Sequence, residues 1–322
     1  MKVFVSGHLP ETVISLLRTE HEVEIHRQGP PITREKLLDS IGEISGLLCM
    51  VTDRIDAGLM DQAPKLRIIS NYGVGTNHID LAAASERGIL VSNTPDVVTE
   101  ATADLTFALI LSTARRVTEG DRRVKEGEFG YWVPFEFLGR EVSGKTLGII
   151  GLGRIGRAVA RRAKGFSMPV IYYNRRKLDT NLENELGVTY QNMDTLIREV
   201  DFVSLHVPLT EETQHMIGAK AFAAMKPTAF LVNTSRGPVV DESALVEALG
   251  KREIAGAGLD VYENEPKLAS GLGEMRNTVL LPHVGSGTWE TRTNIGLKAV
   301  KNLLAGLKGE RPADCINWDL IS

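Results

Sequence analysis

The sequence of 322 residues predicts an α/β protein built from two doubly wound parallel sheets. Short apolar runs alternate with helical patterns along almost the whole chain, as they do in repeated βαβ units. A long apolar helix interrupts this alternation, and the pattern restarts at Thr146, which indicates a second sheet. The chain is long enough for each sheet to form the centre of its own domain.

The first third of the chain alternates short strands and helices. The run 46–51 is apolar throughout, which is typical of a parallel strand buried on both faces. Thr33 stands directly before a helical pattern and is expected to cap it. The strands expected in this part are 2–6, 22–26, 46–51 and 66–71, and the helices are 11–18 and 33–41.

Two long helices are expected to connect the domains. A helix over 100–116 follows the turn at Asn93-Thr94-Pro95 and is expected to lead into the second domain. A helix after Thr288, running to about Leu307, is expected to cross back. The first domain is therefore predicted to combine residues 1–98 with 288–322, and the second to span 99–287.

The second series of strands begins after Thr146. Its strands are expected at 147–151, 169–173, 202–205, 229–233, 256–260 and 279–281. In a doubly wound sheet, ligands bind outside the carboxyl ends of the strands, where the strand order reverses. Polar residues that directly follow these strands are therefore the candidates for a functional site.

A G-x-G-x-x-G run lies between the first of these strands and a helical pattern. Gly151 allows a tight turn, Gly153 lets the backbone approach a pyrophosphate, and Gly156 lets the helix pack close to the strand. The helix that follows points free N–H groups at the phosphates. The alternative is a glycine-rich turn in an ordinary α/β domain. The predicted dinucleotide site comprises Gly151, Leu152, Gly153, Arg154, Ile155 and Gly156.

The end of the next strand indicates which dinucleotide binds. NAD sites carry an acidic residue about 20 positions after the glycine loop, which accepts hydrogen bonds from the ribose 2′-hydroxyl. Here the strand is followed by Asn174, Arg175 and Arg176, and Asp179 lies too far along. Two guanidinium groups can hold a 2′-phosphate. The sequence therefore favours NADP(H) over NAD(H), against the alternative that the basic residues form a solvated turn.

Three polar residues follow later strands and fit the chemistry of hydride transfer to a 2-oxo acid. Arg236 can hold a carboxylate bidentately and polarise the carbonyl. His283 can donate a proton to the forming alkoxide, and Glu265 can pair with the imidazolium. Each has an ordinary structural alternative, such as a surface ion pair or a turn. Their occurrence together behind a dinucleotide loop favours a catalytic set.

Composition excludes several other classes. A net charge of −4 predicts no broad attraction to nucleic acid or to anionic membranes, and no apolar stretch approaches a membrane span. Cys49 and Cys315 are too few for a disulfide framework, which favours a reducing compartment. His206 has no Cys or carboxylate cluster at ligand spacing, so no metal is expected.

Four segments together resemble the D-isomer-specific 2-hydroxyacid dehydrogenase family along nearly the whole chain. They are 71–80, 144–157, 232–241, and 256–266 with 282–286. The resemblance implies two Rossmann- or flavodoxin-like domains with the active site in the cleft between them. The domain of both chain ends would bind the substrate, residues 99–287 would bind NADP, and domain closure would exclude water.

The resemblance also implies roles for individual residues. Arg236, Glu265 and His283 match the catalytic set, and the backbone of Val74 and Gly75 would hold the substrate carboxylate with Arg236. Asp260 would orient the nicotinamide carboxamide. The other residues expected to line the cofactor site are Thr102, His206, Val207, Pro208, Thr213, Thr234, Ser235 and Gly285.

Within the family, the chain is most similar to the NADP-preferring glyoxylate/hydroxypyruvate reductases. The similarity lies in Asn174-Arg175-Arg176 and in the segments 96–104 and 132–139. It implies a cytoplasmic homodimer, Val51 near the substrate, and Trp132 in the partner's substrate pocket or, alternatively, in plain dimer packing.

Two other interpretations of the chain stay open. The nearer is a different enzyme of the same fold: a 2-ketogluconate reductase, a branched 2-oxo-acid reductase or a 3-phosphoglycerate dehydrogenase. The more distant is a dinucleotide-sensing scaffold that resembles the C-terminal-binding-protein corepressors.

Overall fold

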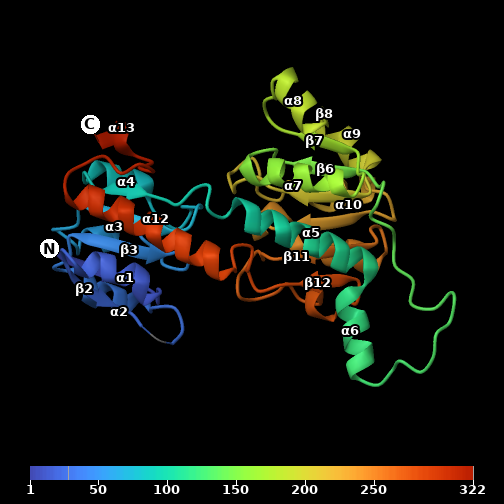
Figure 1. The fold of residues 1–322 in the computed structure, drawn as a ribbon, viewed down its shortest axis with the longest axis horizontal. Helices are drawn as coiled ribbons and strands as arrows, with labels where there is room; N and C mark the ends of the chain where they lie inside the picture. Colours follow the sequence, from blue (N-terminus) through green and yellow to red (C-terminus); the bar gives the residue numbers. More distant parts are fainter. Residues whose placement is uncertain (28, 322) are drawn as a thin grey trace. The chain divides into compact units, whose positions relative to one another are not determined.

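The computed structural model describes residues 1–27 and 29–321 and divides the chain into two compact units. Unit 1 comprises Met1–Val98 with Ser286–Ser322, and unit 2 comprises Thr99–Gly285. Figure 1 shows the two ends of the chain, blue and red, together in unit 1. Within the described residues, no helix is long and apolar enough to cross a membrane.

Unit 1 contains a five-stranded sheet in the order β2-β1-β3-β4-β5, with every pair parallel. Its strands are β1 (Lys2–Val5), β2 (Glu22–Ile25), β3 (Gly46–Met50), β4 (Ile68–Tyr72) and β5 (Leu90–Ser92). Its helices are α1 (Glu11–Arg18), α2 (Arg34–Ile41), α3 (Ala57–Met60), α4 (Leu81–Glu86), α12 (Trp289–Leu307) and α13 (Trp318–Ile321). The predicted cap of α2 is confirmed, because the Thr33 side chain accepts a hydrogen bond from Lys36 N.

The two faces of this sheet have separate cores, since successive side chains of a strand point to opposite faces. Leu47 packs with residues of α2, α3 and α4, whereas Leu48 packs with α1 and α12. The apolar stripe of α12, which includes Ile295 and Leu303, is buried in this second core. Burial of that stripe explains why the C-terminal helix returns to the N-terminal sheet.

Unit 2 contains a seven-stranded parallel sheet in the order β12-β11-β10-β9-β6-β7-β8. The strands are β6 (Leu147–Ile150), β7 (Val170–Tyr173), β8 (Val188–Tyr190), β9 (Phe202–Leu205), β10 (Phe230–Asn233), β11 (Gly256–Leu259) and β12 (Thr278–Leu280). The order reverses between β6 and β9. Ile150 is in register with Tyr173 on one side and Leu205 on the other, so the residues after these three strands start at one level.

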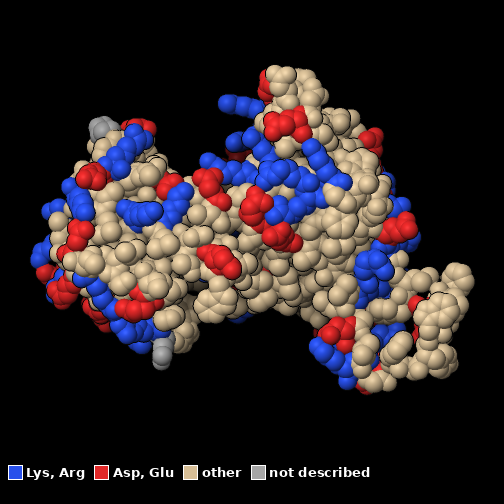
Figure 2. Space-filling view, viewed as in Figure 1, with Lys and Arg blue, Asp and Glu red and all other residues tan. Residues whose placement is uncertain are grey.

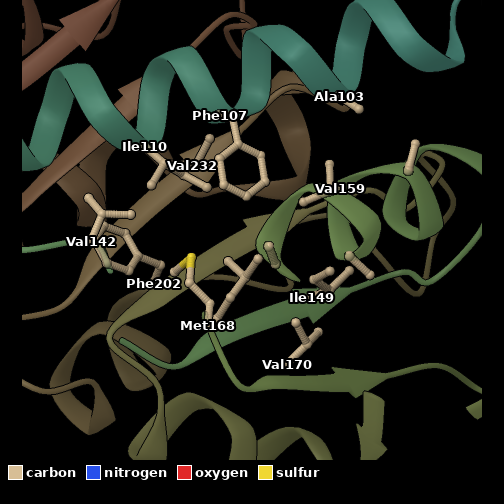
Figure 3. Close-up of a cluster of buried hydrophobic side chains, with 14 of the residues drawn as sticks. Ala103, Phe107, Ile110, Val142, Ile149, Val159, Met168, Val170, Phe202 and Val232 are labelled. Atoms are coloured by element: carbon tan, nitrogen blue, oxygen red, sulfur yellow. The ribbon is translucent and has the colours of Figure 1, made fainter. Parts of the chain in front are cut away.

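Helices cover both faces of this sheet. They are α5 (Thr99–Arg115), α6 (Val117–Lys125), α7 (Arg154–Gly165), α8 (Thr180–Leu186), α9 (Met193–Glu199), α10 (Ala219–Ala224) and α11 (Glu242–Gly250), with 3₁₀ turns at Gly237–Val239 and Leu272–Glu274. Figure 3 shows Phe107 and Ile110 of α5 directed toward Val159 of α7 and the strand residues Phe202 and Val232. This core fixes the N-terminal ends of α5 and α7 above the carboxyl edge of the sheet.

Several elements of the fold were not among the sequence-based expectations, including the short helices α3, α4 and α13. The edge strands β5 and β8 were not predicted, since three residues are too few to show a clear period. Helix α6 was not predicted either, and it has no buried residue. Beyond it, the irregular segment 126–146 extends from unit 2 in Figure 1.

Candidate active site

The glycine loop lies at the point where the strand order reverses. Gly151 has φ +97°, and a Cβ there would lie 2.6 Å from the carbonyl of His206. A Cβ on Gly156 would overlap the carbonyl oxygen of Gly151, so the third glycine allows α7 to pack against the turn. A Cβ on Gly153 would meet no protein atom within 4 Å. The middle glycine therefore borders open space, as a pyrophosphate-binding turn requires.

Asn174 connects the end of β7 to this loop. Its Oδ1 accepts a hydrogen bond of 2.7 Å from Leu152 N. An NAD site carries a carboxylate at this strand end, which accepts hydrogen bonds from the ribose. Here the residue at the strand end is an asparagine, whose side chain is a neutral amide. The turn that follows is held at its other end, because Leu178 N donates to the buried Tyr172 hydroxyl, 2.9 Å away.

Arg175 and Arg176 are exposed on this turn. Within the part of the chain that the structure describes, neither forms an ion pair or a side-chain hydrogen bond. Figure 2 shows further basic side chains gathered over α7, the helix that carries Arg154, Arg157 and Arg161. The turn is thus held firmly while its two guanidinium groups face solvent.

The predicted residues after β9 lie on the other side of the glycine loop. His206 Nε2 lies 2.8 Å from Ser204 Oγ, and its buried Nδ1 has no hydrogen-bond partner among the described residues. Burial lowers the pKa of His206 to about 3, so this imidazole is neutral near pH 7. Thr213 Oγ1 donates to the carbonyl of Pro208 at 2.7 Å, which joins the two ends of the segment 208–213 that directly follows Val207.

A second group of predicted cofactor residues meets at the ends of β10, β11 and β12. Thr106 Oγ1 donates to the carbonyl of Thr102 and lies 2.9 Å from Thr234 Oγ1. A Cβ on Gly285 would lie 3.5 Å from Thr102 Oγ1. Ser235 donates through N and Oγ to the side-chain Oδ1 of Asn233, at 3.0 and 2.8 Å.

His283 and Glu265 form a direct pair. His283 Nδ1 lies 2.8 Å from Glu265 Oε2, and because a carboxylate only accepts, Nδ1 carries the proton and Nε2 is left for another partner. Glu265 Oε1 accepts from Tyr262 N at 3.0 Å. Burial opposes ionisation of Glu265, but these hydrogen bonds and the charges of His283 and Arg236 outweigh it and lower its pKa.

Arg236 is the third member of the predicted set, and it lies near the same carboxylate. Burial lowers the pKa of Arg236, and the charge of Glu265 opposes that change, so the guanidinium stays charged. It donates to the carbonyl of Ser235 at 2.6 Å. The remaining donors of the guanidinium can hold a carboxylate.

The backbone at His283 adopts a left-handed conformation, with φ +54°, which the sequence does not reveal. The turn is held by Asp260, whose two carboxylate oxygens accept from Val284 N and Gly285 N, each at 2.7 Å. Burial raises the pKa of Asp260, and these two hydrogen bonds partly offset that increase. Asp260 thus orients the segment that carries His283, a role that sequence reasoning missed.

The predicted substrate residues of unit 1 gather at the ends of β3 and β4. A Cβ on Gly73 would lie 2.7 Å from the side chain of Val51. The buried Asn71 donates to the carbonyls of Gly73 and Gly75, at 3.0 and 2.9 Å, and so shapes the turn that contains Val74. Gly73 N donates to the carbonyl of Asn71 at 3.0 Å, and the N–H groups of Val74 and Gly75 follow it on this turn.

Trp132 lies in the irregular segment after α6 and is 78% exposed. Large apolar side chains are concentrated in the same segment. The most exposed are Phe129, Tyr131, Trp132, Phe135 and Leu138, between 57% and 89%.

Comparison with known proteins agrees with this arrangement. Residues 107–285 match the model of the D-isomer specific 2-hydroxyacid dehydrogenase, NAD binding domain. The match spans the glycine loop, all three candidate catalytic residues and the candidate cofactor residues named above, except Thr102. The chain belongs to the D-isomer specific 2-hydroxyacid dehydrogenase family.

Several known proteins are similar to the chain over its full or nearly full length. Glyoxylate reductase from Thermococcus litoralis is 48% identical, covering 100% of this chain and 98% of that protein. The TT0316 protein of Thermus thermophilus superposes with a TM-score of 0.93 and 44% identity, covering 98% and 100%. NADPH-dependent glyoxylate/hydroxypyruvate reductase from Sinorhizobium meliloti, solved with NADP and malonate, has a TM-score of 0.84 and 33% identity, covering 98% and 96%.

Proposed function

We propose that this protein reduces a small 2-oxo acid, glyoxylate or hydroxypyruvate, to the 2-hydroxy acid with NADPH. The observation that carries the proposal is the His283–Glu265 pair beside Arg236, at the same edge of the sheet as the glycine loop. The names of the relatives from Thermococcus and Sinorhizobium support the substrate class. The direct test is turnover of these two acids with NADPH.

Each residue of the site has a defined task in this proposal. Arg236 and the N–H groups of Val74 and Gly75 bind the substrate carboxylate. When bound, the nicotinamide supplies the hydride. His283 donates a proton from Nε2 to the carbonyl oxygen, because Nδ1 is occupied by Glu265. The ionised Glu265 stabilises the imidazolium and holds the ring in orientation.

The residues around the glycine loop fit a dinucleotide. Gly153 leaves room for the pyrophosphate, and the N-terminus of α7 has no side-chain cap to compete for its free N–H groups. Thr102, Thr234 and Asp260 lie toward the nicotinamide end, and His206 lies toward the adenine end. Arg175 and Arg176 hold the 2′-phosphate, which is the basis of the proposed preference for NADPH.

Substitutions at Gly156 and Gly153 are expected to have different effects: the first on folding stability and the second on cofactor binding. Gly156→Ala should lower the free energy of unfolding by about 1–3 kcal/mol, because its Cβ overlaps the Gly151 carbonyl. Gly153→Ala should change it by less than about 1 kcal/mol, since the space is open in the protein. The same substitution should weaken NADPH binding about tenfold, the loss of one charge-assisted hydrogen bond. Denaturant unfolding measures the free energy of unfolding, and fluorescence titration measures NADPH affinity. Equal stabilities of the two variants would argue against the packing role of Gly156.

Replacing Arg175 and Arg176 by alanine is expected to raise KM for NADPH about tenfold to hundredfold, through loss of charge-assisted hydrogen bonding worth about 1.5–3 kcal/mol in total. KM for NADH should change less than about twofold, because NADH has no 2′-phosphate. Initial rates with both cofactors give the ratio. Arg198→Ala, at an exposed position on α9, is the matched control. An equal loss with both cofactors would mean that the arginines do not read the 2′-phosphate.

We further propose that the protein forms a homodimer through the segment 126–141. Monomers rarely expose contiguous apolar patches as extensive as Phe129, Tyr131, Trp132 and Phe135. In this dimer Trp132 reaches the partner's substrate pocket. Sedimentation should give about twice the chain mass of 35.2 kDa, and Phe135→Asp should shift the protein toward monomer. A wild-type monomer at micromolar concentration would rule out this assembly.

A further inference from the structure

The loop that carries Glu265 is held by a second, buried carboxylate. Glu242 is the first residue of α11 and is only 2% exposed. Its Oε1 accepts from Glu263 N at 2.7 Å, and its Oε2 accepts from Ala269 N at 3.3 Å. These two N–H groups lie on either side of Glu265 in the chain. One carboxylate therefore joins both ends of the segment 263–269.

The contact between the two segments is reciprocal. Glu242 N lies 3.4 Å from Glu263 Oε2, while Glu263 Oε1 lies 2.5 Å from His215 Nε2. The Glu263 side chain thus binds back to the start of α11 and to the turn at His215. Burial raises the pKa of Glu242, and the nearby charges of Glu263 and Glu265 raise it further, whereas its two backbone hydrogen bonds favour the ionised form.

Glu242 holds the peptide between residues 262 and 263, and this peptide is linked to all three candidate catalytic residues. Tyr262 N, just before it, donates to Glu265 Oε1. The Tyr262 hydroxyl donates to the carbonyl of Leu281 at 2.8 Å, two residues before His283. A Cβ on Gly237, the residue after Arg236, would overlap the carbonyl of Tyr262. A shift of this peptide would therefore displace the partners of Glu265 and the supports of Arg236 and His283.

We propose that Glu242 is a positioning residue of the reaction, which acts through the 262–263 peptide to keep Glu265 within hydrogen-bond distance of His283. This inference rests on the proposed reduction of a 2-oxo acid. A glutamine at this position offers one acceptor oxygen for two backbone donors, so one end of the loop is released. An aspartate keeps both oxygens but is one methylene shorter.

A double-mutant cycle tests the inference. Glu242→Gln is expected to lower kcat for glyoxylate about tenfold, a part of the hundredfold or more that a general acid contributes. In a Glu265→Gln background the same change should have less than about a twofold effect, since the group through which it acts is gone. NADPH affinity should stay unchanged in both backgrounds. Glu247→Gln, an exposed position of α11 paired with Lys251, is the control and should have no effect.

A proton NMR measurement provides a readout that does not need turnover. The Nδ1 proton of His283, hydrogen-bonded to a carboxylate, should give a downfield resonance that Glu265→Gln removes. Glu242→Gln should shift or broaden this signal, and Glu247→Gln should leave it in place. If the Glu242→Gln variant does not fold, Glu242→Asp takes its place in these measurements.

The outcomes separate the two proposals. An active wild type with the same loss of kcat in both backgrounds would make Glu242 a general structural residue and overturn the inference. Unchanged kcat and an unchanged resonance in the folded variants would overturn it as well. A wild type that turns over no 2-oxo acid, while its resonance still responds to Glu242→Gln, would overturn the proposed function and leave the positioning of Glu265 supported.

Discussion

Replacing His283 by alanine is expected to lower kcat for glyoxylate reduction by about a hundredfold to ten-thousandfold, the usual contribution of a general acid. Within the proposed set, His283 is the group assigned to donate the proton to the substrate. Its Nδ1 is held by Glu265 at 2.8 Å, so Nε2 is the ring nitrogen left for the proposed proton transfer. Removing the ring leaves the forming alkoxide without a donor.

The measurement is kcat at saturating NADPH, with the cofactor affinity of each variant as the control for folding. NADPH affinity should change less than about threefold, because His283 is proposed to act on the substrate rather than on the cofactor. Added imidazole should restore part of the rate. A His283→Ala enzyme with near-normal kcat would show that the proton comes from another group.

Replacing Arg236 by lysine is expected to lower kcat/KM for glyoxylate about a hundredfold, although the positive charge is kept. A guanidinium binds a carboxylate through two parallel hydrogen bonds, and an ammonium cannot copy that geometry. The loss of one charge-assisted bond of about 1.5–3 kcal/mol accounts for the expected effect. The Arg236 site is partly buried beside Glu265, so water replaces the missing bond poorly.

Initial rates over a range of glyoxylate concentrations give kcat/KM for this variant. Arg198→Lys on the exposed side of α9 is the control and should match the wild type. A change of less than about twofold in Arg236→Lys would mean that Arg236 does not bind the substrate bidentately.

Much of the fold follows from hydrophobic patterning. Strands such as β3 and β9 are buried along their length and appear in the sequence as short apolar runs. The return of α12 to unit 1 follows from its apolar stripe. β5 and β8 escaped prediction because each has three residues, of which one or two are half-buried or exposed. Helix α6 has no buried face, so it lacks the pattern on which prediction depends.

The positions of the site residues were predicted, but the contacts that hold them were not. Arg236, Glu265 and His283 each follow a strand of one parallel sheet, and such ends meet at one edge. The left-handed turn at His283 depends on Asp260. The segment of Glu265 depends on Glu242 in the same way. These contacts join residues about twenty positions apart, and no local pattern encodes them.

We propose that the site is a working reductase for small 2-oxo acids. The most direct measurement is the initial rate of NADPH oxidation, followed by absorbance, with glyoxylate and hydroxypyruvate, and with NADH, pyruvate and 2-ketogluconate for comparison. The proposal predicts fast oxidation of NADPH with glyoxylate or hydroxypyruvate and slower rates with NADH. Tight NADPH binding without turnover of any 2-oxo acid would contradict it and would favour a dinucleotide-sensing scaffold.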